Sequence, residues 1–225
     1  MNKLKREQML LEIAQQLITE QGMLSFKFTD IAKQAQIDRA TLYQHFHNKE
    51  DVLLSLYSKD AAICLQLLLQ IQVLPTLTSH EKLLSALLLQ LVISNQRYSK
   101  LSNDWVNASP LIYQFAQVER KQQFELLVHQ VWLQHHEFWL QPILAGQLFS
   151  SRAEVETVRH KVMPYHRGLL CQTTMTKVAS PPSLRDSFEH LLHYTGLLKW
   201  RQVPHRVDYG LILQTIDGLL KAYRD

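Results

Sequence analysis

The chain of 225 residues has few of the residues that interrupt or cross-link a fold, with only six glycines, seven prolines and two cysteines. Such low glycine and proline contents disfavour a strand-rich sandwich with many tight turns, and the recurring leucines and glutamines favour long helices with short connections. Hydrophobic residues make up 46% of the sequence, which is enough for a substantial core. We therefore predict an all-α protein.

The two cysteines, Cys64 and Cys171, lie far apart in the sequence and in apolar surroundings, so no disulfide framework is indicated. No secretory leader pattern is found at the start of the sequence, and together these features predict a cytoplasmic location. The most apolar run, residues 83–94, is shorter than the roughly 20 residues needed to cross a bilayer. We accordingly predict no membrane partner.

Catalytic and metal-binding motifs are also lacking, although the chain contains eleven histidines. Residues 135–137 are consecutive and cannot share one helix face, while the pairs His129 with His136 and His190 with His193 lack a third ligand at metal spacing. The sequence contains no H-E-x-x-H motif, no glycine-rich phosphate loop and no G-x-S-x-G motif. We predict no metal, no cofactor and no enzymatic activity.

The net charge of +4 and the pI near 9.0 permit nucleic-acid binding without requiring it. The first 60 residues hold equal numbers of basic and acidic residues. If this part of the chain binds DNA, the placement of its basic residues must therefore provide the positive surface, because there is no excess of positive charge.

The N-terminal region shows the pattern of short amphipathic helices. Residues 3–21 are predicted to form a helix that ends at Gly22, because their apolar residues recur at helical spacing. The stripe consists of Leu10, Ile13, Ala14, Leu17 and Ile18. Thr29 and Asp38 are predicted to cap a second and a third short helix.

Leu42 and Phe46 are one helical turn apart and are predicted to anchor the third helix. Asn48 and Asp51 resemble a capping box, which predicts the start of a long helix that ends before Pro75. Two short helices joined by a tight turn and flanked by longer helices make a helix-turn-helix unit.

Residues 28–57, FTDIAKQAQIDRATLYQHFHNKEDVLLSLY, resemble the DNA-binding signature of the tetracycline-repressor (TetR) family of bacterial regulators. The resemblance lies in the Ile-Ala pair, the Thr-Leu-Tyr-x-His-Phe run and the Asn-Lys-Glu sequence that follows. Gln36 stands where the family commonly has glycine, at a cost of about 1 kcal/mol in a left-handed turn, and Asp38 stands where serine is frequent. The resemblance implies a three-helix DNA-binding domain over residues 1–48, and a helical regulatory and dimerisation domain over residues 49–225.

The N-terminal part of a recognition helix enters the major groove, so its side chains are expected to meet base edges or thymine methyl groups. The predicted base contacts are Arg39, Ala40, Thr41, Tyr43 and Gln44. The predicted phosphate contacts are Thr29, His45 and Lys49. The resemblance implies DNA contacts at the same positions. The alternative is a set of packed helices with no role in nucleic-acid binding.

Beyond Pro75 the sequence predicts further long helices and contains no signature. Helices are expected over residues 79–97, from Ser109 and Pro110 toward Trp139 with a break or bend at Pro142, over 152–176 with Pro164 inside, from Ser183 to about residue 200, and over 206–223. The helices over 152–176 and 183–200 are predicted to pair with a second copy as a four-helix bundle, because a palindromic operator requires a two-fold protein. The last helix, from Arg206, could share this interface, and the sequence does not decide between these arrangements.

Four aromatic residues in the middle of the chain are predicted to line an apolar pocket for a small-molecule inducer. They are Trp105, Tyr113, Phe115 and Trp132. The alternative is that these rings only fill the core where helices cross.

The resemblance implies a dimeric DNA-binding regulator, most simply a repressor that a small molecule releases from a palindromic double-stranded operator. The ligand would change the separation of the two recognition helices, which must lie about 34 to 36 Å apart to enter successive major grooves. The alternative function is a dimeric DNA-binding factor without an inducer, which acts by recruiting or blocking another protein. The sequence indicates neither the ligand nor the operator.

Overall fold

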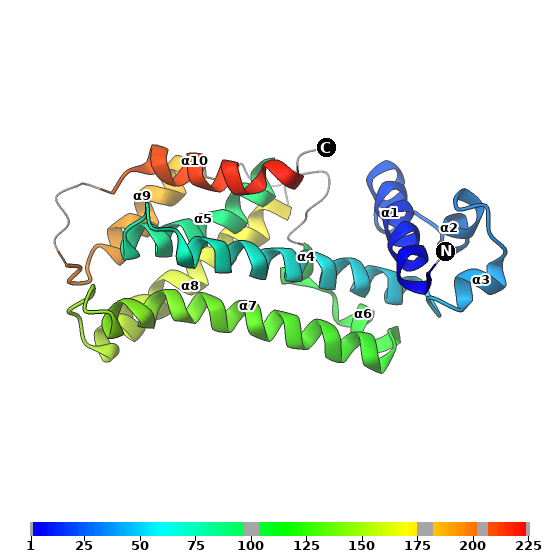
Figure 1. Ribbon diagram of the computed structural model, residues 1–225, viewed down its shortest axis with the longest axis horizontal. Coiled ribbons are helices and arrows are strands. Elements are labelled where there is room, and N and C mark those ends of the chain that lie inside the picture. The colour runs from blue at the N-terminus through cyan, green and yellow to red at the C-terminus, as the bar shows by residue number, and fades with distance from the viewer. Residues whose placement is uncertain (1, 97–103, 175–181, 202–206, 224–225) are drawn as a thin grey trace. The chain divides into compact units, whose positions relative to one another are not determined.

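A computed structural model describes residues 2–96, 104–174, 182–201 and 207–223, and these are almost entirely helical (Figure 1). Among these residues the one β-type pairing is an isolated bridge between Leu148 and Trp200. The all-α prediction is confirmed. The helices divide into two compact units, unit 1 with Met1–Lys59 and Ala108–Val128, and unit 2 with Asp60–Asn107 and His129–Asp225. The domain boundary predicted between residues 48 and 49 stays a prediction.

Unit 1 is built around the first four helices of the chain and one later segment. It contains α1 (Lys3–Gln21), α2 (Phe28–Gln34), α3 (Arg39–Tyr43), the start of α4 (Lys49–Val73), α6 (Pro110–Phe115) and the start of α7 (Val118–Leu144). The predicted stripe of α1 is buried at Leu10, Ala14 and Leu17. The helix ends as predicted at Gly22, which has a φ of 87° and whose amide donates to the carbonyl of Ile18.

The starts of α2 and α3 differ in how they are capped. Asp38 is the N-cap of α3, as predicted, since its side chain accepts a hydrogen bond from the amide of Thr41. The predicted cap at Thr29 is wrong, because Thr29 lies inside α2 and the N-cap is Lys27. The backbone of Lys27 is extended and its carbonyl already accepts a bond from the amide of Asp30, so the helix begins without a side-chain cap.

The turn between α2 and α3 has the predicted left-handed residue. Gln36 has a φ of 54°, and two backbone hydrogen bonds close the turn, from Gln36 to the carbonyl of Lys33 and from Ile37 to that of Ala32. A glutamine therefore occupies a conformation that favours glycine.

Helix α4 begins with half of the predicted capping box. The side chain of Asn48 accepts a bond from the amide of Asp51, but the carboxylate of Asp51 accepts from the amide of His47. The helix ends at Val73, before Pro75, as predicted. By length and composition α4 could cross a membrane, although 61% of its most apolar window is buried, as in the core helix of a folded domain.

Unit 2 contains the remaining helices, with α5 in contact with α8, α9 and α10. These are α5 (Ser79–Gln96), η1 (Asp104–Asn107), α8 (Arg152–Thr174), α9 (Leu184–Thr195), α10 (Tyr209–Leu220) and η2 (Lys221–Tyr223). Pro164 lies inside α8 as predicted, and Ser183 forms a complete capping box with Asp186 at the start of α9. The predicted C-terminal ends at residues 97 and 176 and the predicted start at residue 206 lie outside the described residues.

The middle of the chain differs from the sequence prediction. The single helix predicted from Pro110 to Trp139 is two helices, because α6 ends at Phe115 and α7 begins at Val118. Pro142 does not break the helix, since it lies inside α7 two residues before the last residue, Leu144, and a bend at Pro142 stays a prediction. Its carbonyl accepts from the amides of Gln147 and Leu148, and these bonds close the end of the helix.

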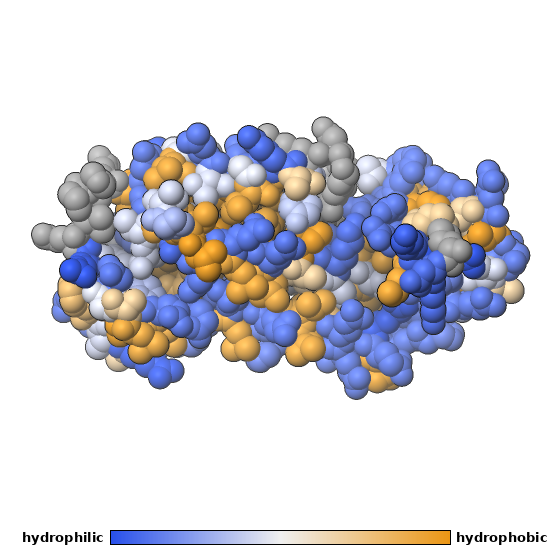
Figure 2. Space-filling view, in the orientation of Figure 1, coloured by the Kyte–Doolittle hydropathy of each residue, from blue (hydrophilic) through white to orange (hydrophobic). Residues whose placement is uncertain are grey.

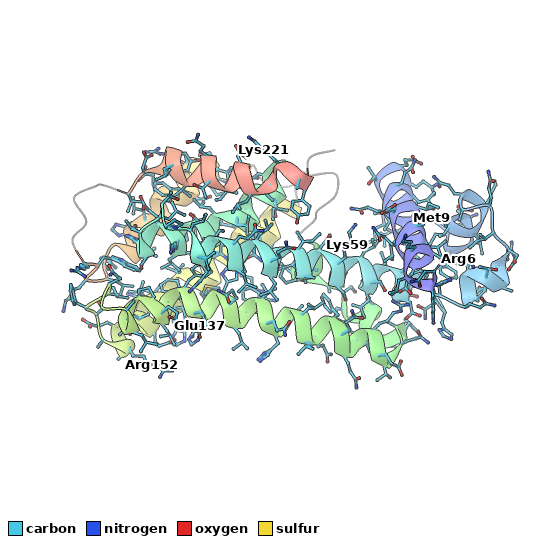
Figure 3. All side chains as sticks on the ribbon, in the orientation of Figure 1. Arg6, Met9, Lys59, Glu137, Arg152 and Lys221 are labelled. Atoms are coloured by element: carbon cyan, nitrogen blue, oxygen red, sulfur yellow. The ribbon has the colours of Figure 1, made fainter. Side chains whose placement is uncertain are left out.

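The surfaces of α4 and α7 mix polar and apolar side chains. Charged residues such as Lys59 on α4 and Glu137 on α7 lie along these helices (Figure 3). Apolar side chains also reach the surface of both helices (Figure 2), where Leu69 and Leu133 are about half exposed and Val73 is 76% exposed. Exposed apolar residues of this kind are common on folded proteins and assign no function by themselves.

Candidate functional site

Helix α3 is anchored on one face and displays polar side chains on the other. Leu42 and Phe46 are completely buried, as the sequence predicts for the anchoring pair. The predicted base-contacting residues lie on the accessible side of the helix and just after it. Arg39, Ala40, Tyr43 and Gln44 are exposed and Thr41 is partly exposed.

The first turn of α3 is fixed by the carboxylate of Asp38. Its two oxygens accept from the amide and the hydroxyl of Thr41, at 2.6 and 3.0 Å. The bond from the amide of Thr41 is the largest of several that lower the pKa of Asp38, so this carboxylate is negatively charged at neutral pH. The hydroxyl hydrogen of Thr41 is used in this bond, and the methyl group and oxygen lone pairs remain for another partner.

The two largest side chains on this face, Tyr43 and Arg39, differ in how firmly they are held. The ring of Tyr43 packs edge-on against Phe28 with centroids 5.4 Å apart, while 48% of the residue stays exposed. Arg39 is exposed, and among the described residues its guanidinium has no ion-pair partner. Arg39 is therefore available for an external acceptor.

The three predicted phosphate contacts occupy different environments. Thr29 is partly exposed in the first turn of α2. Lys49 donates to the carbonyls of Leu24 and Phe26 at 3.1 and 2.9 Å, and burial lowers the pKa of its ammonium group. His45 is only 8% exposed. Lys49 thus holds the connection between α1 and α2, and the phosphate contacts of all three residues stay predictions.

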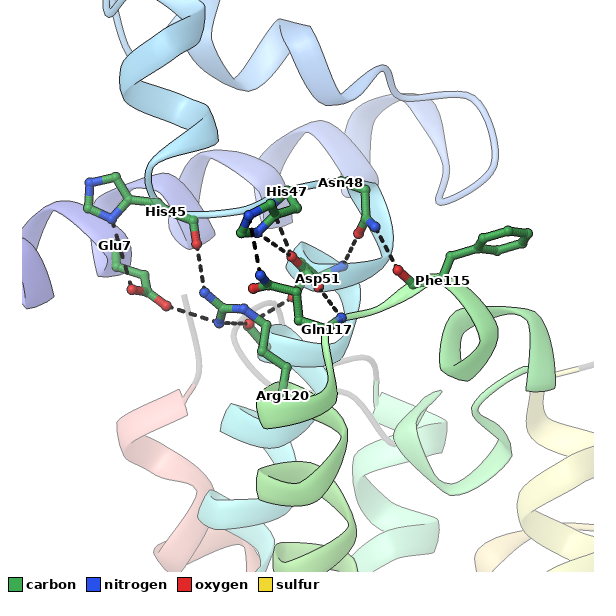
Figure 4. A network of polar contacts seen from close by, with 9 residues as sticks. Glu7, His45, His47, Asn48, Asp51, Phe115, Gln117 and Arg120 are labelled. Atoms are coloured by element: carbon green, nitrogen blue, oxygen red, sulfur yellow. Dashed lines mark hydrogen bonds and ion pairs between the residues drawn. The ribbon is translucent and has the colours of Figure 1, made fainter.

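A polar cluster in unit 1, which the sequence did not indicate, centres on Arg120 (Figure 4). Its guanidinium donates to Glu7 at 3.1 Å, to the hydroxyl of Ser55 and to the carbonyl of His45 at 2.7 Å, and it lies 4.6 Å from the centroid of the Phe46 ring. We call Glu7, His45, Ser55 and Arg120 the Arg120 cluster. It joins α1, α4 and α7 to His45, which lies two residues beyond the end of α3.

The break between α6 and α7 is held by the start of α4. The side chain of Asp51, which is fully buried, accepts a bond from the backbone amide of Gln117 at 2.8 Å. The side-chain amide of Asn48 donates to the carbonyl of Phe115 at 2.7 Å (Figure 4). The end of α6 and the start of α7 are thereby fixed to the segment that follows α3. These contacts also explain why the predicted single helix is interrupted here.

The four aromatic residues predicted to line a pocket are divided between the two units. Tyr113 and Phe115 belong to unit 1, where Tyr113 contacts Phe124 and Phe115 is 57% exposed. Trp105 and Trp132 belong to unit 2, where Trp105 is buried. Whether any of them binds a ligand stays a prediction.

In the described part of unit 2, two of the hollows are not lined by these aromatic residues. One of about 350 Å³ lies beside α9 and the start of α10, and one of about 170 Å³ lies among α4, α5 and α7. In the described part of the chain, no group of three or more histidine, cysteine, aspartate or glutamate side chains is arranged to hold a metal ion.

A tight turn, a capped and anchored second helix and a displayed polar face are the features of a helix-turn-helix unit. Residues 10–56 match the family model of bacterial regulatory proteins, tetR family. The match covers the N-terminal part of the chain, which is therefore similar to the regulators of that family. A comparison with curated proteins found no match.

Solved structures of regulators share the fold at low sequence identity. AmtR of Mycobacterium smegmatis aligns with a TM-score of 0.57 and 15% identity over 94% of this chain and 92% of its own. FadR of Bacillus subtilis, solved in complex with stearoyl-CoA, aligns with a TM-score of 0.57 and 18% identity over 83% and 95% of the two chains. At these identities the likeness is one of fold.

Proposed function

We propose that the chain is a homodimeric repressor that binds a palindromic operator through α3 and leaves it when a small molecule binds in unit 2. The observation that carries the proposal is the exposed face of α3, where Arg39, Thr41 and Gln44 stand on a helix that Leu42 and Phe46 anchor. An arginine at the start of a recognition helix can bind a guanine edge through two hydrogen bonds, and a glutamine can do the same with adenine.

The test compares base-reading with phosphate-binding residues on an operator selected from a random duplex pool. Arg39→Ala is expected to weaken operator binding by roughly 1 to 3 kcal/mol and to leave binding to a random duplex nearly unchanged. Fluorescence anisotropy with both duplexes across a salt series measures the difference. Equal losses on both duplexes would contradict base reading by Arg39.

Lys49→Ala is expected to weaken both duplexes alike and to reduce the salt dependence by about one unit. Since the ammonium also binds the carbonyls of Leu24 and Phe26, thermal unfolding of the same variant separates loss of a phosphate contact from loosening of the α1–α2 connection. His45 is left out of the proposed interface, because its ring is buried.

A two-fold dimer through α8 and α9 fits the surface of these helices. The ring of Tyr165 on α8 packs at a tilt against that of His190 on α9 with centroids 4.0 Å apart, and His190 contacts Tyr194, which gives a partly exposed aromatic surface. Gly168 lies in α8 with open space where a side chain would begin, so another helix can approach closely there. Gly168→Arg is expected to give a monomer by light scattering, and a dimer in this variant would place the interface elsewhere.

Control by a ligand is supported by helix α7, which contributes polar side chains to both units. The helix supplies Arg120 to the Arg120 cluster in unit 1 and the buried His135 to unit 2. A ligand that prefers one position of α7 by about 1 to 3 kcal/mol would shift the protein between binding and non-binding states. FadR shows that a regulator with this fold can hold a small molecule. If no ligand changes operator affinity, the dimeric factor without an inducer is the better account.

A further inference from the structure

Unit 2 buries two histidines from different helices next to each other. His135 on α7 is 2% exposed and His166 on α8 is completely buried, and their ring centroids are 6.3 Å apart. Trp132 lies beside His135 at 5.7 Å between centroids. Imidazole rings are costly to bury unless their nitrogens are hydrogen-bonded, so their partners need to be identified.

Only one of the four ring nitrogens has a hydrogen bond with the described residues. Nε2 of His166 lies 2.7 Å from the carbonyl oxygen of Leu87 on α5. Nδ1 of His166 and both nitrogens of His135 are buried without a partner among these residues. The indole nitrogen of Trp139, one turn further along α7, is likewise buried and unpaired within the described part of the chain. Three side chains thus present unused polar atoms in the core.

The chemistry of these atoms follows from their partners and their charge. Burial lowers the pKa of His135 to about 3 and that of His166 to about 4, so both rings are uncharged at neutral pH. The carbonyl of Leu87 can only accept, so Nε2 of His166 carries the hydrogen and Nδ1 is an acceptor. His135 offers one donor and one acceptor, and Trp139 offers a donor.

Buried polar atoms in folded proteins almost always find a partner in protein, water or ligand. A hydroxyl group can donate to an imidazole nitrogen while it accepts from an imidazole or indole N–H, and a primary amide can do the same. A carboxylate or phosphate offers only acceptors and would leave Nδ1 of His166 unpaired unless the ring took up a proton. The donors and acceptors of this cluster therefore favour a neutral partner over an anion.

We propose that His135, Trp139 and His166 form the polar centre of a ligand site in unit 2 that takes an uncharged small molecule with a hydroxyl or amide group on an apolar body. This inference rests on the proposed function only in that the same ligand would release the operator. It assigns to the regulator a class of ligand and the residues that recognise it.

The test uses four probes of similar size and different polar groups, namely toluene, phenol, benzamide and benzoate. Each is titrated into the protein labelled at histidine, and the imidazole NMR signals are assigned from His135→Leu and His166→Leu. Phenol and benzamide are expected to shift the signals of His135 and His166, and to bind at least about tenfold more tightly than toluene and benzoate, equally at pH 6 and pH 8. The advantage is expected to disappear in both leucine variants.

His129→Gln is the matched control, because His129 is exposed on the same helix and its replacement should change nothing. If phenol and benzamide shift neither signal, or keep their advantage in both leucine variants, the proposal is wrong and the nitrogens hold only buried water. Benzoate as the tightest probe, with an affinity that rises toward pH 6, would overturn the uncharged class.

Operator affinity is measured in parallel, with and without the probes. Probes that bind through the histidines but leave operator affinity unchanged would remove the release step of the proposed function while the site stands. An unaltered preference for the operator in Arg39→Ala would count against the proposed DNA-binding surface, independently of the ligand site.

Discussion

The two units bury polar side chains in different ways. In unit 1 the two terminal nitrogens of the Arg120 guanidinium donate to a carboxylate, a hydroxyl and a carbonyl, and only its Nε and Nδ1 of His45 have no hydrogen bond with the described residues. In unit 2 the rings of His135 and His166 are uncharged, and together they make one hydrogen bond with the described residues. A buried charge requires partners, whereas a neutral imidazole can be buried with some of its atoms unpaired at a smaller cost.

The difference matches what each unit is proposed to do. A recognition helix must keep its orientation when it meets DNA, and a network of paired groups around His45 and Phe46 holds the residues that follow α3. A site that responds to a ligand must have polar atoms still available. The Arg120 cluster therefore fixes the shape of unit 1, whereas His135 and His166 in unit 2 can accept another molecule.

The largest expected effect is the sensitivity of the histidine cluster to acid. His135 and His166 have pKa values of about 3 and about 4 in the folded protein and near 6.5 in the unfolded chain. The unfolded state therefore binds protons first, so stability is retained above pH 6.5 and is lost as the pH falls toward 4. At pH 5 each imidazole is expected to lower the free energy of unfolding by about 2 kcal/mol.

Urea unfolding at pH 7 and pH 5 measures this loss. Because other histidines also titrate, the result is the difference between the wild type and the His135→Leu/His166→Leu double variant, which should lose about 4 kcal/mol less. The same loss in both proteins would mean that the two rings are already protonated or solvated in the folded state.

The next largest effect is expected for the Arg120 cluster. Arg120→Ala is expected to lower the free energy of unfolding of the protein by roughly 2 to 4 kcal/mol, since it leaves Glu7 and the carbonyl of His45 without their partner and removes the contact with Phe46. Operator and random duplexes should both bind more weakly. Lys121→Ala, at the next position of α7, is the control and should change stability by less than about 0.5 kcal/mol.

The third prediction is a substitution in the core that stabilises the protein, whereas most core substitutions destabilise it. His135→Leu is expected to raise the free energy of unfolding by about 1 to 2 kcal/mol at pH 7, because it removes two buried nitrogens that have no partner among the described residues. The same variant should lose ligand binding, as expected where function and stability compete. Thermal unfolding without probes provides the measurement, and a clear decrease would show that the imidazole already has a partner, such as a bound water.

Local patterns in the sequence predicted most of unit 1. The anchoring pair Leu42 and Phe46, the cap at Asp38 and the left-handed turn at Gln36 depend on residues a few positions apart, and all three were found. The Arg120 cluster was not predicted, because it joins Arg120 to Glu7, far apart in the chain, and neither residue has a distinctive neighbour. Spacing rules carry no signal for such pairs.

The candidate site in unit 2 was missed for a related reason. In the sequence, His135 stands out only as a possible metal ligand beside His136. That His135 is buried while His136 stays partly exposed depends on which face of α7 meets the core, and the sequence does not show this face directly. His166 carries no signal until α8 packs against α5 and its ring reaches the carbonyl of Leu87. The aromatic residues expected to act together, by contrast, are divided between the two units by a chain that returns to unit 1 at Ala108–Val128.

The smallest expected effect concerns the backbone strain at Gln36, in the turn between α2 and α3 of unit 1. Gln36 has a φ of 54°, which costs a residue with a side chain about 1 kcal/mol relative to glycine. Gln36→Gly is therefore expected to raise the free energy of unfolding by up to about 1 kcal/mol, with operator affinity unchanged, because the backbone of the turn already has this shape. Ala35→Gly is the control, since Ala35 has a φ of −74° and glycine there should lower stability by about 0.5 to 1 kcal/mol. A loss of operator affinity in Gln36→Gly at unchanged stability would mean that the glutamine side chain itself meets the DNA, and the interface would then extend from α3 into the turn before it.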